Sequence, residues 1–308
     1  MILTVTANPA IDRVYFVDRF QMGEVHRPQT VTVTAGGKGL NVARIAKTLG
    51  ADACAMGFAG GQSGAFICEE VQKLGITEAF TKIAEETRIN FNITDRDGRS
   101  GEILAEGPLV TSAECEQFLQ AFSSRLPTCS VAVASGSLPR GLDSSFYRRL
   151  IEIAKGGGVR LIVDTSGAAL ADVIEQKPFM VKPNADELSA LLGKKIGDRE
   201  DLRAALLSLA DKGVTIPFIT LGADGAVALV EGRCYRLRSP RVQVINTVGS
   251  GDSCIGGIAF GLDRGMPLLD CLRLGMAAGT ANTQFCETGR VSTDLVRRYY
   301  DEVTIEEF

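Results

Sequence analysis

The sequence predicts an α/β protein with a mostly parallel central sheet, helices on both faces and a small β-sheet lid. Short apolar, β-branched runs alternate with amphipathic helical patterns along most of the 308 residues. Polar or glycine-rich clusters follow several of these runs, as they do at the carboxyl edge of a parallel sheet. Two stretches, at about 11–35 and 88–107, alternate like strands with no helix between, and these predict the lid. Because α/β folds often use such a length as one unit, we expect a single domain over 1–308.

Each element of the N-terminal half has its own signal. Apolar residues at helical spacing end at Gly50 and again at Gly75, and glycine is a common helix stop. The predicted elements are, in order, a strand at 2–6, helices near 38–49 and 67–74, a helix that starts at the capping box Thr111-x-x-Glu114, a strand at 131–134 and a helix near 144–155.

The C-terminal half continues the alternation. Its predicted elements are strands at 161–163 (ending in Asp164) and 179–181, an amphipathic helix around 202–209, strands at 217–221 and 226–230, a strand-like run at 242–245, and helices near 252–264 and 268–285.

The lid has the clearest strand patterns. Thr30–Thr34 alternates threonine with valine. Arg88–Thr94 and Glu102–Ala105 flank the turn dipeptide Asp97-Gly98, which predicts a hairpin.

Composition excludes several classes of function. The net charge of −4, with no basic stripe, argues against nucleic acid as a partner. No apolar run is long enough for a membrane helix, and the first residues lack a signal-peptide pattern, so we expect a cytoplasmic protein without a membrane partner. A single histidine, His26, rules out an HExxH zinc site. Eight cysteines without a CxxC pair are expected to be reduced thiols.

The sharpest chemical signal is Asn246-Thr247-Val248-Gly249-Ser250-Gly251-Asp252-Ser253, where a glycine turn opens a helix. The amides of such a turn can bind an anion. Asp252 lies in the first turn and could take a hydroxyl proton, a pairing that suits phosphoryl transfer. The alternative is that Asp252 is only a helix cap.

A second cluster, Ala35-Gly36-Gly37-Lys38-Gly39-Leu40-Asn41, also opens a helix. Lys38 is followed by glycine where a Walker A loop has Ser or Thr, so this is a different kind of anion site, or a turn with a solvated lysine. Neither loop is a dinucleotide fingerprint, because Cys254 stands where the third glycine would be.

Weaker signals lie elsewhere. Asn184 and Glu187 share a face at a helix start and could serve magnesium, or simply cap the helix. Ser135-Gly136-Ser137-Leu138-Pro139 follows a strand and could present hydroxyls to a sugar. Asp12 could bind sugar hydroxyls, and Arg88 with Asn90 could clamp a phosphate.

Taken together, these motifs resemble the ribokinase-like, or PfkB, family of carbohydrate kinases. NPAxD, GGKGxN, TRxN, SGSLP, KPNxxE, TLGxxG and VGSGDS follow one another in the family's order over nearly the whole chain. The resemblance implies a three-layer α/β/α ribokinase-like fold. NPAxD, TRxN and SGSLP point to the branch of 1-phosphofructokinases and tagatose-6-phosphate kinases.

The resemblance also implies a role for each position. Asp252 would be the catalytic base, and the amides of Gly249, Ser250 and Gly251 would stabilise the transferring phosphoryl group. The sugar phosphate would be held by Asp12, Gly37, Lys38, Asn41, Arg88, Asn90 and Ser137. ATP would be bordered by Lys182, Asn184, Thr220, Gly222, Gly225, Gly249, Gly251 and Asn282. Asn184 and Glu187 would organise Mg²⁺, largely through water. The family's lid strands often pair between subunits, which implies a homodimer.

Several functions remain open at this point. The first is conversion of fructose 1-phosphate to fructose 1,6-bisphosphate, preferred because its kinase is the commoner member of the branch. The second is phosphorylation of tagatose 6-phosphate to its 1,6-bisphosphate; the sequence does not fix the stereochemistry at C4, which separates tagatose from fructose. Remoter alternatives are a ribokinase or nucleoside kinase, and a sensor without turnover; the sensor is disfavoured because Asp252, the loop glycines and Glu187 are all present.

Overall fold

The computed structural model describes residues 1–308, and its centre is a sheet of eleven strands. In spatial order these are β15 (Thr304–Glu307), β14 (Arg233–Arg238), β13 (Ala226–Val230), β12 (Ile216–Thr220), β11 (Met180–Val181), β10 (Arg160–Asp164), β9 (Val131–Ser135), β1 (Ile2–Thr6), β4 (Ala53–Gly60) and β5 (Thr77–Glu78), with β6 (Thr81–Ile83) also paired to β4. Neighbouring strands are parallel from β12 to β5, and β13–β15 add an antiparallel edge.

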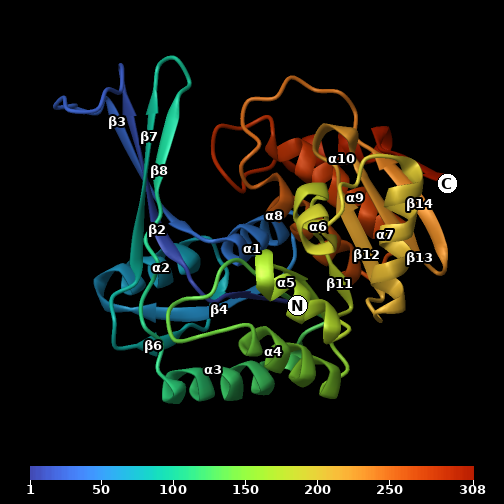
Figure 1. The fold of residues 1–308 in the computed structure, drawn as a ribbon. Helices are drawn as coiled ribbons and strands as arrows, with labels where there is room; N and C mark the ends of the chain where they lie inside the picture. Colours follow the sequence, from blue (N-terminus) through green and yellow to red (C-terminus); the bar gives the residue numbers. More distant parts are fainter.

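Helices cover both faces of this sheet (Figure 1). One face carries α1 (Lys38–Thr48), α8 (Ser250–Asp263), α9 (Leu268–Asn282) and α10 (Thr293–Glu302), and the other carries α3 (Ser112–Arg125), α4 (Ser145–Gly156), α5 (Gly167–Glu175), α6 (Ala185–Leu192) and α7 (Arg199–Asp211). Successive side chains of a strand point to opposite faces of the sheet and pack in different cores. Leu3 packs in the core that contains Phe118 of α3, and Ile2 packs in the core that contains Ile255 of α8. The predicted three-layer fold is confirmed.

A second, four-stranded sheet forms the lid and projects away from the three layers (Figure 1). Its order is β3 (Thr30–Gly36), β2 (Ala10–Val17), β7 (Arg88–Asp95) and β8 (Ser100–Ile103). The base of the lid packs on α2 (Gly61–Lys73), where Ile11 and Ala35 share a small core with Ile67.

The hairpin of the lid differs slightly from its predicted bounds. The turn at Asp97-Gly98 is present, and Thr94 pairs with Ser100, so the second strand starts two residues earlier than expected. It ends at Ile103 because Ala105 leaves the ladder: its amide donates to the Asn90 side chain and its carbonyl accepts from Arg88.

Some elements were not predicted, and one prediction was wrong. The 242–245 run is a loop, with Val244 and Ile245 more than half exposed, because no neighbouring strand pairs with it. The fully buried β4 escaped prediction because ACAMGFAG contains no β-branched residue. The helices α5 and α10 and the edge strands β14 and β15 were also missed.

The thiols mostly follow expectation. All eight cysteines are free, and five of them are buried, whereas Cys286 is exposed. No helix is both long and apolar enough to cross a membrane.

Candidate active site

Asp252 lies in the first turn of α8 and is only 6% exposed. One carboxylate oxygen accepts a hydrogen bond of 2.8 Å from the Asn41 side-chain amide of α1. Burial, followed by the negative charge of Asp164, raises the pKa of Asp252 to about 6, against the opposing effects of Asn41, Lys38 and Lys182. A carboxylate with a pKa near neutrality is suited to act as a general base.

The turn before Asp252 has the geometry of an anion site. Gly249 has φ of 80°, and a Cβ there would lie 2.7 Å from the Thr288 side chain, so only glycine fits. The Ser250 amide donates to the Thr247 carbonyl at 3.2 Å. The amides of Gly249 and Gly251 therefore remain the best placed for a phosphoryl group at this helix start.

Asn282 of α9 supports this turn from behind and is completely buried. Its oxygen accepts from the Ser253 hydroxyl (3.1 Å) and the Gly289 amide (2.9 Å). Its nitrogen donates to the Val248 carbonyl (2.9 Å) and the Ser250 hydroxyl (3.3 Å). Because these contacts occupy its amide, we infer that Asn282 shapes the phosphate turn from within the protein.

A buried ion cluster lies next to the base. Asp164, at the carboxyl end of β10, contacts Lys182 at 3.3 Å and Lys38 at 3.5 Å, and accepts from the Ser135 hydroxyl at 3.3 Å. Burial would raise the pKa of Asp164, but Lys182 and Lys38 outweigh it and lower that pKa. A Cβ on Gly251 would lie 3.2 Å from the Lys182 ammonium, which places this cation beside the turn.

Asp164 was recognised only as the end of a strand and was given no role. The signal was available, because an acidic residue that directly follows a buried strand lies where ligands of a parallel sheet bind. Lys38 and Lys182 together place two positive charges on Asp164, and that of Lys182 lies beside the glycine turn before Asp252.

Asn184 and Glu187 form a reciprocal capping box on α6. The Glu187 amide donates to the Asn184 side chain (2.8 Å), and the Asn184 amide donates to the Glu187 carboxylate (2.9 Å). No group of three or more acidic, cysteine or histidine side chains gathers anywhere to hold a metal. The contacts of Asn184 and Glu187 are thus those of a helix cap, and their role toward Mg²⁺ stays a prediction.

The predicted nucleotide glycines lie beyond the end of β12. Thr220 is half-buried and pairs with Asn184 across an isolated bridge. Gly222 has open space around it, whereas a Cβ on Gly225 would lie 2.0 Å from the Leu237 carbonyl. Gly225 is thus required by the packing of β13 against β14, and Gly222 is the one free to approach a ligand.

The lid carries the predicted sugar-binding side chains on its polar face. Asp12 of β2 accepts from the Asn90 amide of β7 at 2.9 Å, and a Cβ on Gly36 would collide with its carboxylate. Burial raises the pKa of Asp12. The hydrogen bond from Asn90 lowers it by less, so the pKa is raised overall. Gly37 has φ of 126° and packs on Thr6, which holds the start of α1 close to β1.

Arg88 has a structural task at the same place. Its guanidinium donates to the Ala105 carbonyl (2.7 Å) and the Asn8 carbonyl (2.8 Å), tying the end of the lid to the turn after β1. It also lines a cavity of ≈ 430 Å³ that Arg140 borders as well. Ser137 is exposed nearby and lies 3.4 Å from the Asn8 amide. Both terminal nitrogens of Arg88 thus have a backbone partner, its Nε is buried without one, and its role toward a phosphate stays a prediction.

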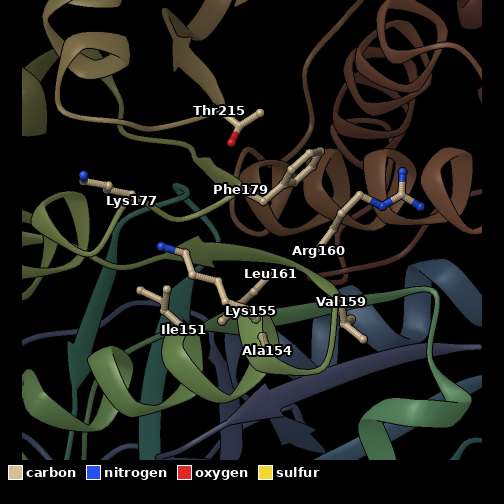
Figure 2. Close-up of a pocket in the computed structure, with 10 residues that line it drawn as sticks. Ile151, Ala154, Lys155, Val159, Arg160, Leu161, Lys177, Phe179 and Thr215 are labelled. Carbon is tan, nitrogen blue, oxygen red and sulfur yellow. The ribbon is translucent and has the colours of Figure 1, made fainter.

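A second cavity, of ≈ 190 Å³, lies at the opposite edge of the sheet (Figure 2). It is bordered by residues that precede or begin β10, β11 and β12, among them Arg160, Phe179 and Thr215. The Arg160 guanidinium points away from Lys155 and Lys177, so the cations do not converge there (Figure 2). None of the predicted site residues borders this cavity.

The structure therefore brings Lys38, Asn41, Lys182 and Asp252 into one cluster, with Asp12 and Asn90 on the lid. A carboxylate with a pKa of about 6, a glycine turn at a helix start and two lysines on one carboxylate define a phosphotransferase site on a ribokinase-like fold.

Comparison with known proteins places the chain within that class. The model of the pfkB family carbohydrate kinases matches residues 4–293, and the chain belongs to this family. A tagatose-6-phosphate kinase of Staphylococcus epidermidis is 37% identical over 310 residues, covering all of both chains.

Solved structures agree. A putative phosphofructokinase from Staphylococcus aureus has a TM-score of 0.88 at 33% identity, covering 100% of this chain and 99% of that one. Phosphofructokinase-2 from Escherichia coli, in complex with potassium, has a TM-score of 0.91 at 29% identity, with 98% of each chain covered. A possible 1-phosphofructokinase from Thermotoga maritima has a TM-score of 0.90 at 28% identity, covering 100% and 99%.

Proposed function

We propose that this kinase transfers the γ-phosphoryl group of ATP to a ketohexose phosphate, with fructose 1-phosphate as its substrate and fructose 1,6-bisphosphate as its product. The observation that carries the proposal is Asp252: a buried carboxylate with a pKa of about 6, next to free amides at the start of α8.

In this mechanism Asp252 takes the proton of the acceptor hydroxyl as its oxygen attacks the γ-phosphorus. The bond from that phosphorus to the β,γ-bridging oxygen breaks, and ADP leaves. The Gly249 and Gly251 amides, with Lys38 and Lys182, offset the charge on the transferring group. Mg²⁺ would neutralise the ATP phosphates, with Asn184 and Glu187 contributing through water.

The far end of the sugar would lie under the lid. Asp12 and Asn90 present an oxygen and an amide to sugar hydroxyls, and Arg88 would bind the existing phosphate. Closure of the lid would exclude water, which would otherwise compete with the sugar for the phosphoryl group.

The test is ATP-coupled turnover with magnesium on fructose 1-phosphate, fructose 6-phosphate, tagatose 6-phosphate and ribose in parallel. We expect the highest kcat/KM on fructose 1-phosphate. This ratio is the quantity to compare, because it measures discrimination between substrates. A dominant rate on ribose would overturn the phosphate site under the lid. Absence of turnover on all four, with ATP binding intact, would favour a sensor.

Tagatose 6-phosphate is the second candidate, favoured by the 37% identity to a protein named tagatose-6-phosphate kinase. Both sugars carry a phosphate at one end and an acceptor hydroxyl at the other, so the site accommodates either in outline. The same substrate panel separates them.

The lid also supports a homodimer. Phe91 pairs with Ile103, and Val33 lies in the same cross-strand row on the far side of Arg13, on the face opposite Asp12 and Asn90. Val33, Phe91 and Ile103 are 39%, 37% and 66% exposed. Exposed apolar side chains gathered on one sheet face, with an arginine among them, are typical of an interface. We infer that the lid of a second copy covers it.

Replacing Ile103 with glutamate should therefore convert a dimer to a monomer in light scattering coupled to size exclusion. Ser100→Glu, on the polar face of the same strand, is the matched control and should leave the mass unchanged. If the wild-type chain is monomeric, or Ile103→Glu keeps the dimer, the lid is not the interface.

A further inference from the structure

Arg44 of α1 lies one helical turn beyond Asn41 and is not among the residues that the family resemblance singles out. One guanidinium nitrogen donates to the side-chain oxygen of Asn41 at 2.8 Å. A second donates to the backbone carbonyl of Ala35 at 2.9 Å, at the end of lid strand β3. Arg44 is half-buried, and the planar fork of arginine can make both contacts at once.

The contact with Asn41 decides which end of that amide faces the base. An asparagine side chain has a donor end and an acceptor end, and only the donor end can bind a carboxylate. In this structure the nitrogen of Asn41 donates to Asp252 while its oxygen accepts from Arg44. A flipped amide would face Arg44 with donors and Asp252 with lone pairs, so both contacts would become repulsive.

The other neighbours of Asn41 do not select this orientation. A Cβ on Gly289 would lie 2.9 Å from the Asn41 oxygen, so the backbone there confines the amide sterically. Confinement alone does not distinguish oxygen from nitrogen, because the two ends have nearly the same size. The selection therefore falls to the two hydrogen-bond partners, Asp252 and Arg44, and Arg44 is the one that fixes the amide independently of the base.

We propose that Arg44 is a positioning residue for phosphoryl transfer: it orients the Asn41 amide so that this amide holds the carboxylate of Asp252. The inference rests on the proposed role of Asp252 as base. It also connects the lid to the base, since the Ala35 carbonyl on β3 is the other partner of the same guanidinium.

The charge of Arg44 must be separated from this orienting effect. The charged groups around Asp252 are Asp164, Lys38 and Lys182, and Arg44 adds a further positive charge. Arg44→Met removes both the charge and the donors, whereas Arg44→Lys keeps the charge and can make only part of the fork's contacts.

The decisive experiment is a double-mutant cycle with Arg44→Met, Asn41→Ala and the combined variant. We expect Arg44→Met to lower kcat about tenfold with the KM for ATP within about twofold, and Asn41→Ala to lower kcat at least as much. In the Asn41→Ala background, Arg44→Met should have little further effect. If the two effects multiply instead, Arg44 does not act through Asn41.

Arg44→Lys supplies a second test if Arg44→Met folds poorly. We expect an intermediate kcat with the thermal unfolding midpoint close to that of the wild type. If Arg44→Lys lowers kcat by the same factor with and without Asn41→Ala, Arg44 does not act through Asn41 and the proposal is overturned.

A readout without turnover separates this inference from the proposed function. The carboxyl carbon of Asp252 can be titrated by ¹³C NMR, with its signal assigned by its loss in Asp252→Asn. We expect a higher pKa for Asp252 in Arg44→Met than in wild type, and a smaller increase from Arg44→Met when Asn41 is already alanine. If the sugar phosphates are not turned over, this titration still tests whether Arg44 acts on Asp252 through Asn41. An unchanged pKa of Asp252 in Arg44→Met would overturn the positioning role of Arg44.

Discussion

Asp252→Asn should lower kcat by about 10²- to 10⁴-fold while leaving the binding of ATP and sugar phosphate nearly unchanged, because this is the range that a general base contributes. Asparagine keeps the shape of the side chain and can still accept from Asn41, but it cannot take a proton from the acceptor hydroxyl. Coupled turnover and calorimetric titration with each substrate measure the two halves of the prediction.

The matched control is Asp301→Asn, an exposed position on α10, which should behave like the wild type.

In the wild-type enzyme, kcat/KM should fall as pH drops through about 6, where Asp252 becomes protonated. Because the folded-state pKa of Asp252 is raised, its contribution to stability is present at low pH and is lost as pH rises through about 6. Asp252→Asn should thus gain stability relative to wild type above that pH. Near-normal turnover in the variant would refute the role of Asp252 as base.

Lys182→Met should be the most destabilising change near the site, lowering the free energy of unfolding by about 3–5 kcal/mol. The Lys182 side chain is 8% exposed and its partner Asp164 is 5% exposed, so removing the cation leaves a buried carboxylate poorly compensated. Denaturant unfolding measures the loss.

Lys38→Met provides the comparison, because Lys38 contacts the same carboxylate from a side chain that is 47% exposed. Its loss should cost about 1 kcal/mol or less in stability, yet still lower kcat, since its charge faces the reaction centre. Combining Lys182→Met with Asp164→Asn should recover much of the lost stability. Equal free energies of unfolding for Lys182→Met and Lys38→Met would show that burial of the Lys182–Asp164 pair does not make its loss more destabilising.

Much of the fold could be predicted because the local signals agree with the tertiary structure. The capping box at Thr111 and Glu114 is present with both of its hydrogen bonds, and the α3 helix that it predicts is there, with Phe118 and Phe122 buried. The buried strand β4 could not be predicted, because its small residues are chosen by close packing on β1: a Cβ on Gly57 would lie 2.0 Å from the Thr6 carbonyl. Such a choice depends on a neighbour about 50 residues away in the chain.

The candidate site divides in the same way. Motifs placed Asp252 and Lys38 at helix starts, because a glycine turn before a helix is visible within a few residues. Nothing local shows that Asp164 pairs with both lysines, or that Asn282 holds the phosphate turn from behind.

What the sequence determined by itself is therefore the class of fold, the order of its motifs and the kind of chemistry they allow. Only the tertiary structure decided that Asp252 is buried enough to have a pKa of about 6, and that Arg44 and Asn41 lie in line with it. The physical reason is range: caps, turns and periodicity act over a few residues, whereas burial and the charges around a carboxylate are set by groups that only folding brings together.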